Sequence, residues 1–378
     1  MTSDVFITRT AAYLPFDSVS NDEMESVLGM VGNRPSRARR IILRNNGIQQ
    51  RHYAIDRATG QPAMSHAEMT ARAIRALGED IGPVDCLAVG TSKPDQLVPN
   101  HGVMVHGELG WPQMQVVALS GICLSGAAAL KYAAMSVATG DSRKAIATGS
   151  ELVSAVMQAK NFDAEVEHRV ALLEERPEIA FEKDFLRWML SDGAGALMIE
   201  PQPAAQGVSL RIKWIELFSF AHLFPACMYA GAEKLDDGSL KGWDRYTAKA
   251  LAERSVLTLK QDVRLLNEEV MVTVREPLKA VQRKYGIRPQ DIDWYLPHVS
   301  SMYFAPRVDA AMHEVGFGIP QEKWFTNLVR CGNTGSASPY IMLDELVRSG
   351  RLKRGETVLL YVPESGRFSS GFILLEVA

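Results

Sequence analysis

The feature that most constrains the fold of this chain is an internal repeat, because the same succession of helix and strand signals occurs twice. Residues 65–78 carry a helical pattern, and Asp85 precedes the short apolar strand Cys86–Thr91. Residues 270–285 carry a second helical pattern, and Asp293 precedes a second apolar strand. Asp85 and Asp293 are 208 residues apart.

A second pair of segments repeats at nearly the same spacing. Cys123 and Asn333 each begin a helix-like segment of small residues that ends at a glycine 17 residues later. Strands predicted over 145–151 and 358–364 follow these segments. Cys123 and Asn333 are 210 residues apart, so two independent matches at similar offsets indicate a duplication.

We therefore expect an α/β fold of two pseudo-symmetric halves, residues 1–205 and 206–378, stacked in an αβαβα arrangement. Cys123 and Asn333 would then lie at equivalent helix starts that meet in the middle of the molecule. His298 would lie at the carboxyl end of a central strand, where open α/β sheets hold their ligands. The repeat thus predicts a cluster of one cysteine, one histidine and one asparagine.

The surroundings of Cys123 suggest chemistry for this cluster. Gln115–Leu119 reads as a short buried strand, and the helix follows directly after Cys123. At a helix N-terminus the unpaired N–H groups and the helix dipole favour a thiolate, which is the nucleophilic form of cysteine. A buried core thiol is an equally good interpretation of this local sequence.

Composition excludes several classes of function. The 378 residues are 47% hydrophobic with a formal net charge of −3, so we expect a globular protein without nucleic-acid partners. No apolar run is long enough to span a membrane, and the N-terminus lacks the pattern of a signal peptide. The four cysteines show neither pairing nor metal-binding spacing, so we expect a cytoplasmic protein without a metal.

In their order along the chain, the motifs resemble those of the thiolase superfamily, and within it the β-ketoacyl-acyl-carrier-protein synthase III group of condensing enzymes. The motifs are Arg44–Arg51, Gly90–Asp95, the segment around Cys123, Ser191–Ala196, His298 and Gly332–Ser338. The similarity runs along nearly the whole chain, and it implies a thiolase-like fold.

The resemblance also implies roles for individual residues. Cys123 would be acylated by a thioester, and His298 and Asn333 would bind the thioester carbonyl of a second substrate. The turn at Ser365 and Gly366 would help to hold the oxyanion of the acyl transfer. The substrates would arrive on the phosphopantetheine of an acyl carrier protein or of coenzyme A, with no further cofactor.

The resemblance further implies a homodimer that pairs through the strand after the nucleophile helix, residues 145–150.

Three departures from the family pattern point to a specialised branch. Val299–Ser301 stands where the family usually has Gln-Ala-Asn, and Pro363–Gly371 replaces a glycine-richer turn. The interval of 175 positions from Cys123 to His298 also exceeds the interval in the housekeeping enzymes. We therefore expect a role in secondary metabolism, such as the formation of dialkylresorcinol or cyclohexanedione precursors.

The additional length lies in two places. Asn161–Trp188 combines charged runs with apolar anchors, as expected of a helical flap over a cavity. Residues 216–231 contain Phe220 and Met228, which would form an apolar wall of the acyl pocket. Enlargement of the core or of a dimer contact explains both segments nearly as well.

A basic cluster precedes these segments. It consists of Arg34, Arg37, Arg39, Arg40 and Arg44. Such a cluster would suit a phosphate-bearing substrate or an acidic carrier protein, although a solvated helix face is the commoner explanation.

Other interpretations remain open at this stage. Gly121–Ser125 is similar to a nucleophile elbow, which makes a cysteine hydrolase or another acyl transferase without C–C bond formation the alternative enzyme. A non-catalytic partner subunit is a different possibility, although such subunits typically lose the nucleophile. His222 and Cys227 lie close in sequence, but without two further ligands they read as core or pocket residues rather than a metal site.

Overall fold

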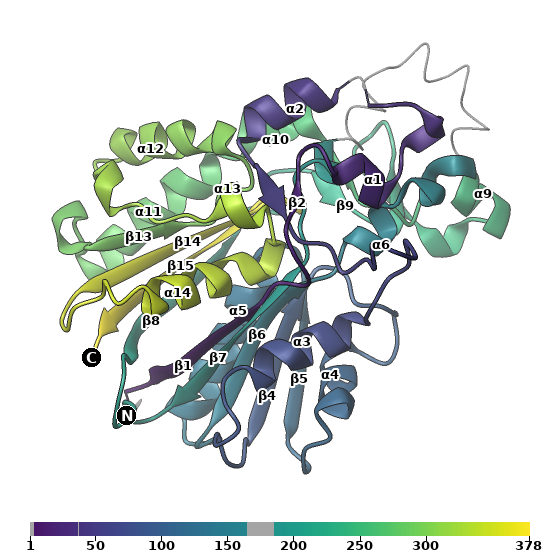
Figure 1. Ribbon diagram of the computed structural model, residues 1–378. Helices are drawn as coiled ribbons and strands as arrows, with labels where there is room; N and C mark the ends of the chain where they lie inside the picture. The colour runs from purple at the N-terminus through teal and green to yellow at the C-terminus, as the bar shows by residue number, and fades with distance from the viewer. Residues whose placement is uncertain (1–3, 37, 165–184) are drawn as a thin grey trace.

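The structure is a computed structural model that describes residues 4–36, 38–164 and 185–378 (Figure 1). The strands are β1 (Phe6–Tyr13), β2 (Val19–Ser20), β3 (Gln50–Arg51), β4 (Cys86–Thr91), β5 (Gln115–Ser120), β6 (Ala145–Glu151), β7 (Gly193–Glu200), β8 (Leu210–Ser219), β9 (Met228–Tyr229), β10 (Ala232–Lys234), β11 (Leu240–Gly242), β12 (Lys260–Gln261), β13 (Trp294–Pro297), β14 (Thr357–Glu364) and β15 (Ser369–Val377). The α-helices are α1 (Met24–Leu28), α2 (Arg39–Asn46), α3 (His66–Arg75), α4 (His101–Leu109), α5 (Leu124–Ala138), α6 (Ser154–Met157), α9 (Ala248–Glu253), α10 (Val263–Glu269), α11 (Val272–Tyr285), α12 (Ala305–Glu314), α13 (Leu328–Cys331) and α14 (Ser338–Arg348). Two of the short 3₁₀ helices matter for the site, η5 (Met302–Phe304) and η7 (Gly335–Ala337).

Within the described residues, the main sheet has nine strands in the order β13-β14-β15-β8-β1-β7-β6-β4-β5. It divides in the middle, because β1 and β8 pair only at Phe6 with Arg211 and at Ile7 with Leu210. One part therefore contains β1, β7, β6, β4 and β5, and the other contains β8, β15, β14 and β13 (Figure 1). The first part precedes the second along the chain.

The helices complete a layered architecture. α5 and α14 each contact strands of both parts of the sheet, so they form the central layer. α3 packs on β6, β7 and β1 and contacts α4, and α11 packs on β14 and β15 and contacts α12 (Figure 1). The layered αβαβα arrangement predicted from the repeat is therefore confirmed.

The repeat is visible in the order of the elements. In the first part α3 leads into β4, and α4, β5, α5, β6 and β7 follow; in the second α11 leads into β13, and α12, α14, β14 and β15 follow. The counterpart of β5 is reduced to a single parallel bridge between Tyr295 and Trp324.

Small residues allow the central layer to pack closely. A Cβ atom on Gly126 of α5 would lie 2.4 Å from the backbone oxygen of Ser336, and one on Gly149 of β6 would lie 2.2 Å from the same oxygen. The hydroxyl of Tyr340 in α14 donates a 2.7 Å hydrogen bond to the backbone oxygen of Gly126. Only glycine fits at these two positions, so η7 and α14 lie directly against α5 and β6.

Three details of the sequence interpretation are wrong. β5 is the exposed edge of the sheet rather than a buried strand. β6 is the strand expected at a dimer contact, but it pairs with β4 and β7 on its two sides and has no free edge. Asn333 does not begin a helix directly, because η7 intervenes before α14 starts at Ser338.

The insertions are described only in part. Residues 165–184, which include most of the predicted flap, lie outside the described residues. At its end, Leu186 and Trp188 are buried in the hydrophobic core. In the second segment Cys227 is buried but His222 is exposed, so the expected core or pocket position holds only for the cysteine. Among the described helices, none combines the length and apolar character needed to cross a bilayer.

Candidate active site

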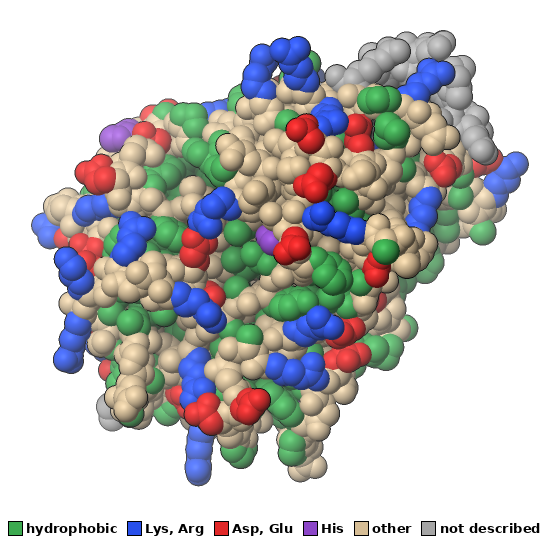
Figure 2. Space-filling model, in the orientation of Figure 1, with side chains coloured by type: hydrophobic (Ala, Val, Ile, Leu, Met, Phe, Trp, Pro, Cys, Tyr) green, Lys and Arg blue, Asp and Glu red, His purple; other side chains and the backbone are tan. Residues whose placement is uncertain are grey.

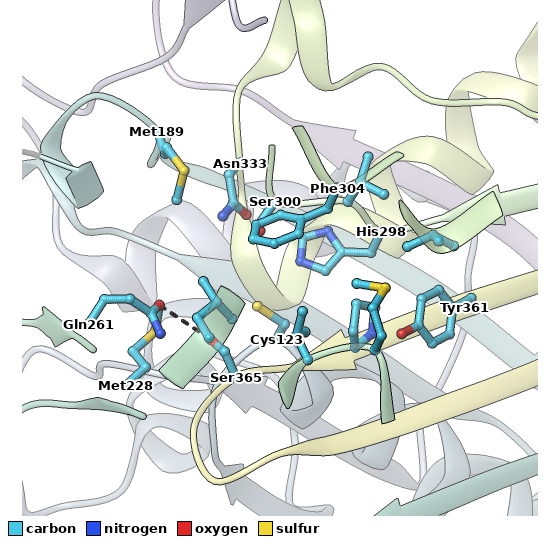
Figure 3. Close-up of a pocket in the computed structure, with 16 residues that line it drawn as sticks. Cys123, Met189, Met228, Gln261, His298, Ser300, Phe304, Asn333, Tyr361 and Ser365 are labelled. Atoms are coloured by element: carbon cyan, nitrogen blue, oxygen red, sulfur yellow. Dashed lines mark hydrogen bonds between the residues drawn. The ribbon is translucent and has the colours of Figure 1, made fainter. Parts of the chain in front are cut away.

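A pocket lies where the two halves meet, and Cys123, His298 and Asn333 all line it (Figure 3). It encloses about 580 Å³ of space including its open mouth. Most of its wall is apolar. The other lining residues are Met189, Met228, Gln261, Leu266, Val270, Met271, Val299, Ser300, Phe304, Val308, Tyr361, Pro363 and Ser365.

Cys123 is positioned by the start of α5. It is the N-cap residue of this helix, its own side chain makes no capping hydrogen bond, and it is 8% exposed. Burial raises the pKa of the Cys123 thiol well above its usual range, and the carboxylates of Glu364 and Glu151 raise it further. Burial and two nearby carboxylates thus oppose the thiolate that the helix N-terminus favours.

His298 follows β13 directly and is fixed by its backbone, whose N–H donates a 2.8 Å hydrogen bond to the Tyr361 carbonyl. Its side chain is buried, and neither ring nitrogen has a hydrogen-bond partner among the described residues. Burial lowers the pKa of His298 to about 4, so the imidazole is neutral near pH 7. A neutral imidazole carries one N–H donor, which is available to a ligand in the pocket.

Asn333 is held at both ends of its backbone. Its N–H donates to the Met189 carbonyl at 3.0 Å, and its carbonyl accepts from the Ser191 N–H at 2.9 Å. The side-chain Oδ1 accepts a 3.0 Å hydrogen bond from the Gly335 N–H, which fixes the orientation of the amide. The Nδ2 group is therefore the part of the side chain left to donate to a ligand.

The remaining predicted site residues are divided between the pocket and its surroundings. Ser365 and Met228 line the pocket. Gly366 is not among the lining residues. Its carbonyl accepts hydrogen bonds from the N–H groups of Cys227 at 2.8 Å and Met228 at 3.2 Å, so it holds the backbone of the lining residue Met228 in place. Phe220 is absent from the lining and packs against the hydrophobic core, so its assignment to the pocket wall is wrong.

Two carboxylates beside the site were not singled out from the sequence. Glu364 accepts hydrogen bonds from the N–H groups of Ile122 at 2.9 Å and Leu124 at 3.1 Å, and Glu151 accepts from the Ser336 N–H at 3.2 Å. The available signal was the repeat, because the predicted strands 145–151 and 358–364 both end in glutamate.

The basic cluster is not uniform. Arg39 forms ion pairs with Asp22 at 3.1 Å and Glu25 at 2.9 Å, whereas Arg40 and Arg44 of α2 are exposed, as is Arg34. Arg37 lies outside the described residues. Figure 2 shows positive and negative side chains interspersed over this face of the molecule rather than one field of a single sign.

Within the described ranges, no group of three or more His, Cys, Asp or Glu side chains is arranged to hold a metal ion.

Comparisons with known proteins concern the family and the fold of the chain. Residues 282–374 match the family described as 3-oxoacyl-[acyl-carrier-protein (ACP)] synthase III C terminal. OleA from Xanthomonas campestris is 19% identical at a TM-score of 0.73, over 100% of this chain and 99% of that chain. The synthase III FabH from Pseudomonas aeruginosa is 19% identical at a TM-score of 0.69, over 99% of this chain and 98% of that chain.

A third solved structure, described as the tetronic acid condensing enzyme AbyA1, is 19% identical at a TM-score of 0.71, over 98% of this chain and 99% of that chain. At such identities these likenesses establish the fold of the chain. Residues 282–374 thus match the C-terminal family model of 3-oxoacyl-acyl-carrier-protein synthase III, and the whole chain has the thiolase-like fold of these solved structures.

Proposed function

We propose that this protein is a condensing acyltransferase that forms a carbon–carbon bond between two acyl thioesters. The observation that carries the proposal is the shared pocket, in which a buried thiol lies with two side chains that each have a donor group left for a ligand. Cys123 is the nucleophile, and His298 and Asn333 are the donors.

In the first step Cys123 accepts an acyl group. Its sulfur attacks the thioester carbonyl carbon, a new S–C bond forms, and the bond to the carrier sulfur breaks. The proton lost by the cysteine ends on the departing carrier thiol. The exchange of one thioester for another has little thermodynamic cost, which suits a step that must be followed by a second reaction.

In the second step the other substrate becomes a carbon nucleophile, by loss of carbon dioxide or of an α-proton. The negative charge then develops on its thioester oxygen, and the N–H donors of His298 and Asn333 stabilise it. The carbanion attacks the acyl carbonyl carbon, and the C–C bond forms as the acyl C–S bond to Cys123 breaks. The leaving sulfur becomes a thiol again by taking up a proton, which is the one removed from the α-carbon or, after decarboxylation, one from solvent. A neutral histidine suits this role, because the donor is needed without a proton transfer to the substrate.

The carriers we propose are the phosphopantetheine arms of acyl carrier protein or coenzyme A, without a further cofactor. α2, which bears exposed Arg40 and Arg44, packs against η5, and Phe304 of η5 lines the pocket. A basic helix thus lies beside the site, where it can attract a phosphate or an acidic carrier.

We assign the protein to secondary metabolism. The support is the departure from the family pattern at Val299–Ser301 and the turn after β14, together with the equal identity to a synthase III and to a tetronic acid condensing enzyme. Formation of dialkylresorcinol or cyclohexanedione precursors is one such role.

We also infer a homodimer, with the contact moved from β6 to β5. β5 has a free edge, and all its residues are exposed or half-buried. Leu97 and Val98, on the loop after β4, are 71% and 82% exposed, so covering them by a second copy would remove apolar surface from water.

The alternatives receive less support. An α/β-hydrolase elbow does not agree with the layered fold. A non-catalytic subunit has no need of a pocket that retains the thiol and both donors. An acyl transferase that stops after the first step shares Cys123, so it must be separated by experiment.

Intact mass measurement after incubation with a panel of acyl-coenzyme A and acyl-carrier thioesters tests the proposal. We expect an acyl adduct that is found on Cys123 by peptide mapping, is absent in Cys123→Ala, and is consumed when a second thioester yields a longer carbon skeleton. Continued acylation and turnover by Cys123→Ala would exclude the mechanism, and hydrolysis as the sole fate of the adduct would favour the alternative transferase.

A further inference from the structure

A carboxylate occupies the start of the nucleophile helix. Glu364 is the last residue of β14 in the second half, and its Oε2 accepts the N–H groups of Ile122 at 2.9 Å and Leu124 at 3.1 Å in the first half. These two N–H groups flank Cys123, which has no side-chain cap of its own. Glu364 therefore caps α5 from the other half of the molecule.

The other central helix has an equivalent cap. Glu151 is the last residue of β6 in the first half, and its carboxylate accepts the N–H groups of Ser336 at 3.2 Å and Ser92 at 3.1 Å. Ser336 belongs to η7, which leads into α14 of the second half. Each central strand thus ends in a glutamate that caps the central helix segment of the opposite half. Because the two halves carry equivalent caps, the position of Glu364 is a regular feature of the fold.

The cap has a consequence for the thiol. A helix N-terminus carries partial positive charge that stabilises one nearby anion. Glu364 already supplies that anion, so a thiolate at Cys123 would be a second negative charge in a buried site. The titratable groups around Cys123 come from three strands and their ends: Glu364 and Tyr361 of β14, Glu151 of β6, and His298 after β13. No lysine or arginine is among the described residues that line the pocket.

The glutamate is itself largely buried. Burial raises the pKa of Glu364, while the hydrogen bonds from Ile122 and Leu124 lower it. Since both N–H groups bond to Oε2, that oxygen accepts whether Glu364 is ionised or not. Removal of the charge therefore need not remove the cap, which makes the two effects separable.

We propose that Glu364 is a positioning residue that keeps Cys123 as a thiol in the resting protein. The thiol then loses its proton during acyl transfer itself, when the S–C bond to the acyl group forms, the carrier C–S bond breaks, and the proton ends on the departing carrier thiol. This inference deepens the proposed function, but its test needs no acyl substrate.

The test is the pH profile of Cys123 alkylation by iodoacetamide, followed by peptide mass spectrometry. We expect the midpoint for the wild-type protein to lie above about 8.5, the value for a free cysteine. Glu364→Gln keeps an acceptor oxygen for the two N–H groups and removes the charge. Its midpoint should be lower by about one pH unit, and its alkylation near neutral pH should be about tenfold faster.

Glu376→Gln is the matched control. Glu376 lies on β15, where its carboxylate pairs with Lys213 at 3.0 Å, and it is not part of the pocket lining. This variant should keep the wild-type profile. A shift of the same size in Glu376→Gln would contradict a local effect of Glu364.

Two results overturn the proposal: a wild-type midpoint at or below about 8.5, or a folded Glu364→Gln protein with the wild-type profile. Circular dichroism establishes whether the variant is folded, and if it is not, the wild-type midpoint decides. A low midpoint with normal acylation would reject the role of Glu364 and leave the proposed function intact. A shifted profile in Glu364→Gln together with failure of the wild-type protein to become acylated would support the role of Glu364 and reject the proposed function.

Discussion

At the scale of single residues, the proposed nucleophile and the two proposed donors come from different halves of the chain. Cys123 comes from the first half, whereas His298 and Asn333 come from the second. The donors have different supports, since His298 is held through its backbone and Asn333 through its backbone and its Oδ1 atom. Each can therefore be removed without removing the support of the thiol.

Asn333→Ala should remain acylatable but lose condensation. In the proposed mechanism the amide donor acts on charge that appears only as the carbanion forms, and loss of one such donor costs on the order of 100-fold in rate. Single-turnover kinetics would measure acylation by mass and condensation by product. Equal loss of both steps in a folded variant would contradict the division of roles.

Met228→Ala should shift acyl preference towards longer or bulkier chains. Met228 lines the pocket, so truncation of its side chain enlarges the space beside Cys123. Phe220→Ala is the matched control, because Phe220 packs against the core and not in the lining. Chain-length profiling of both variants would measure the shift. The pocket assignment of Met228 fails if both variants keep the wild-type preference.

At the scale of elements, the central layer depends on the absence of side chains. Gly149→Ala would bring a Cβ atom to 2.2 Å from the Ser336 carbonyl oxygen, so η7 must move. Overpacking of this kind costs about 1–3 kcal/mol of unfolding free energy. Condensation should also fall, because Asn333 lies only two residues before the start of η7.

Gly107→Ala is the control for Gly149→Ala. Gly107 lies within α4, and a Cβ atom there would have no heavy atom within 4 Å. This variant should be unchanged or more stable by up to about 1 kcal/mol, because alanine favours helix more than glycine does. Urea denaturation of both variants measures the difference, and equal stability of the two would contradict the packing argument.

Much of this element-scale arrangement could be predicted from the sequence, and the failures have physical reasons. The repeat predicted β4, β6, β13 and β14 because buried strands are short apolar runs with clear ends. It could not predict that β5 is an edge strand, since an apolar run does not reveal which neighbour a strand lacks. The raised pKa of Cys123 was equally hidden, because its main cause is burial in the folded protein, and Glu364, which raises it further, is 241 residues away in sequence.

At the scale of the whole molecule, stability should depend on buried histidines. His66 and His101 are buried side by side with ring centroids 4.4 Å apart, and the His101 Nε2 lies 3.2 Å from the Thr70 hydroxyl. Burial lowers the pKa of His101 to about 4 and that of His66 well below its usual range. Below pH 6.5, the ordinary histidine value, the unfolded chain therefore binds protons that the folded protein does not.

The contribution of His101 to stability is thus complete above about pH 6.5 and is lost as the pH falls towards 4. Burial raises the pKa of Glu151 to about 7, and this group acts in the opposite direction between its ordinary value of 4.5 and 7. His101→Gln should therefore reduce the pH slope of the unfolding free energy by up to about 1.4 kcal/mol per pH unit relative to the wild type. Urea titrations at several pH values measure this slope.

His222→Gln, at an exposed position, is the control for His101→Gln and should keep the wild-type slope. Identical slopes in all three proteins would show that His101 does not couple protonation to folding.

The oligomeric state is the second property at this scale. Ala118 is exposed on β5, so Ala118→Arg should be tolerated by one subunit but should place like charges together in a β5 to β5 contact. Sedimentation at micromolar concentration should show a dimer for the wild-type protein and a monomer for Ala118→Arg. Ala205→Arg, on the exposed loop before β8, should remain dimeric. A wild-type monomer, or a dimer in all three proteins, would contradict a contact through β5.

The reciprocal caps have a consequence for how the two halves can evolve. Glu364 accepts hydrogen bonds from the backbone around Cys123, and Glu151 accepts one from the backbone of Ser336. Each half therefore carries a glutamate that stabilises a helix start in the other half. After a duplication, a substitution of the glutamate at the end of either strand would change the helix start in the other half. The sequences of the two halves could then diverge only by coupled substitutions. Each substitution at a strand end would require a second substitution at the helix start that the strand end caps.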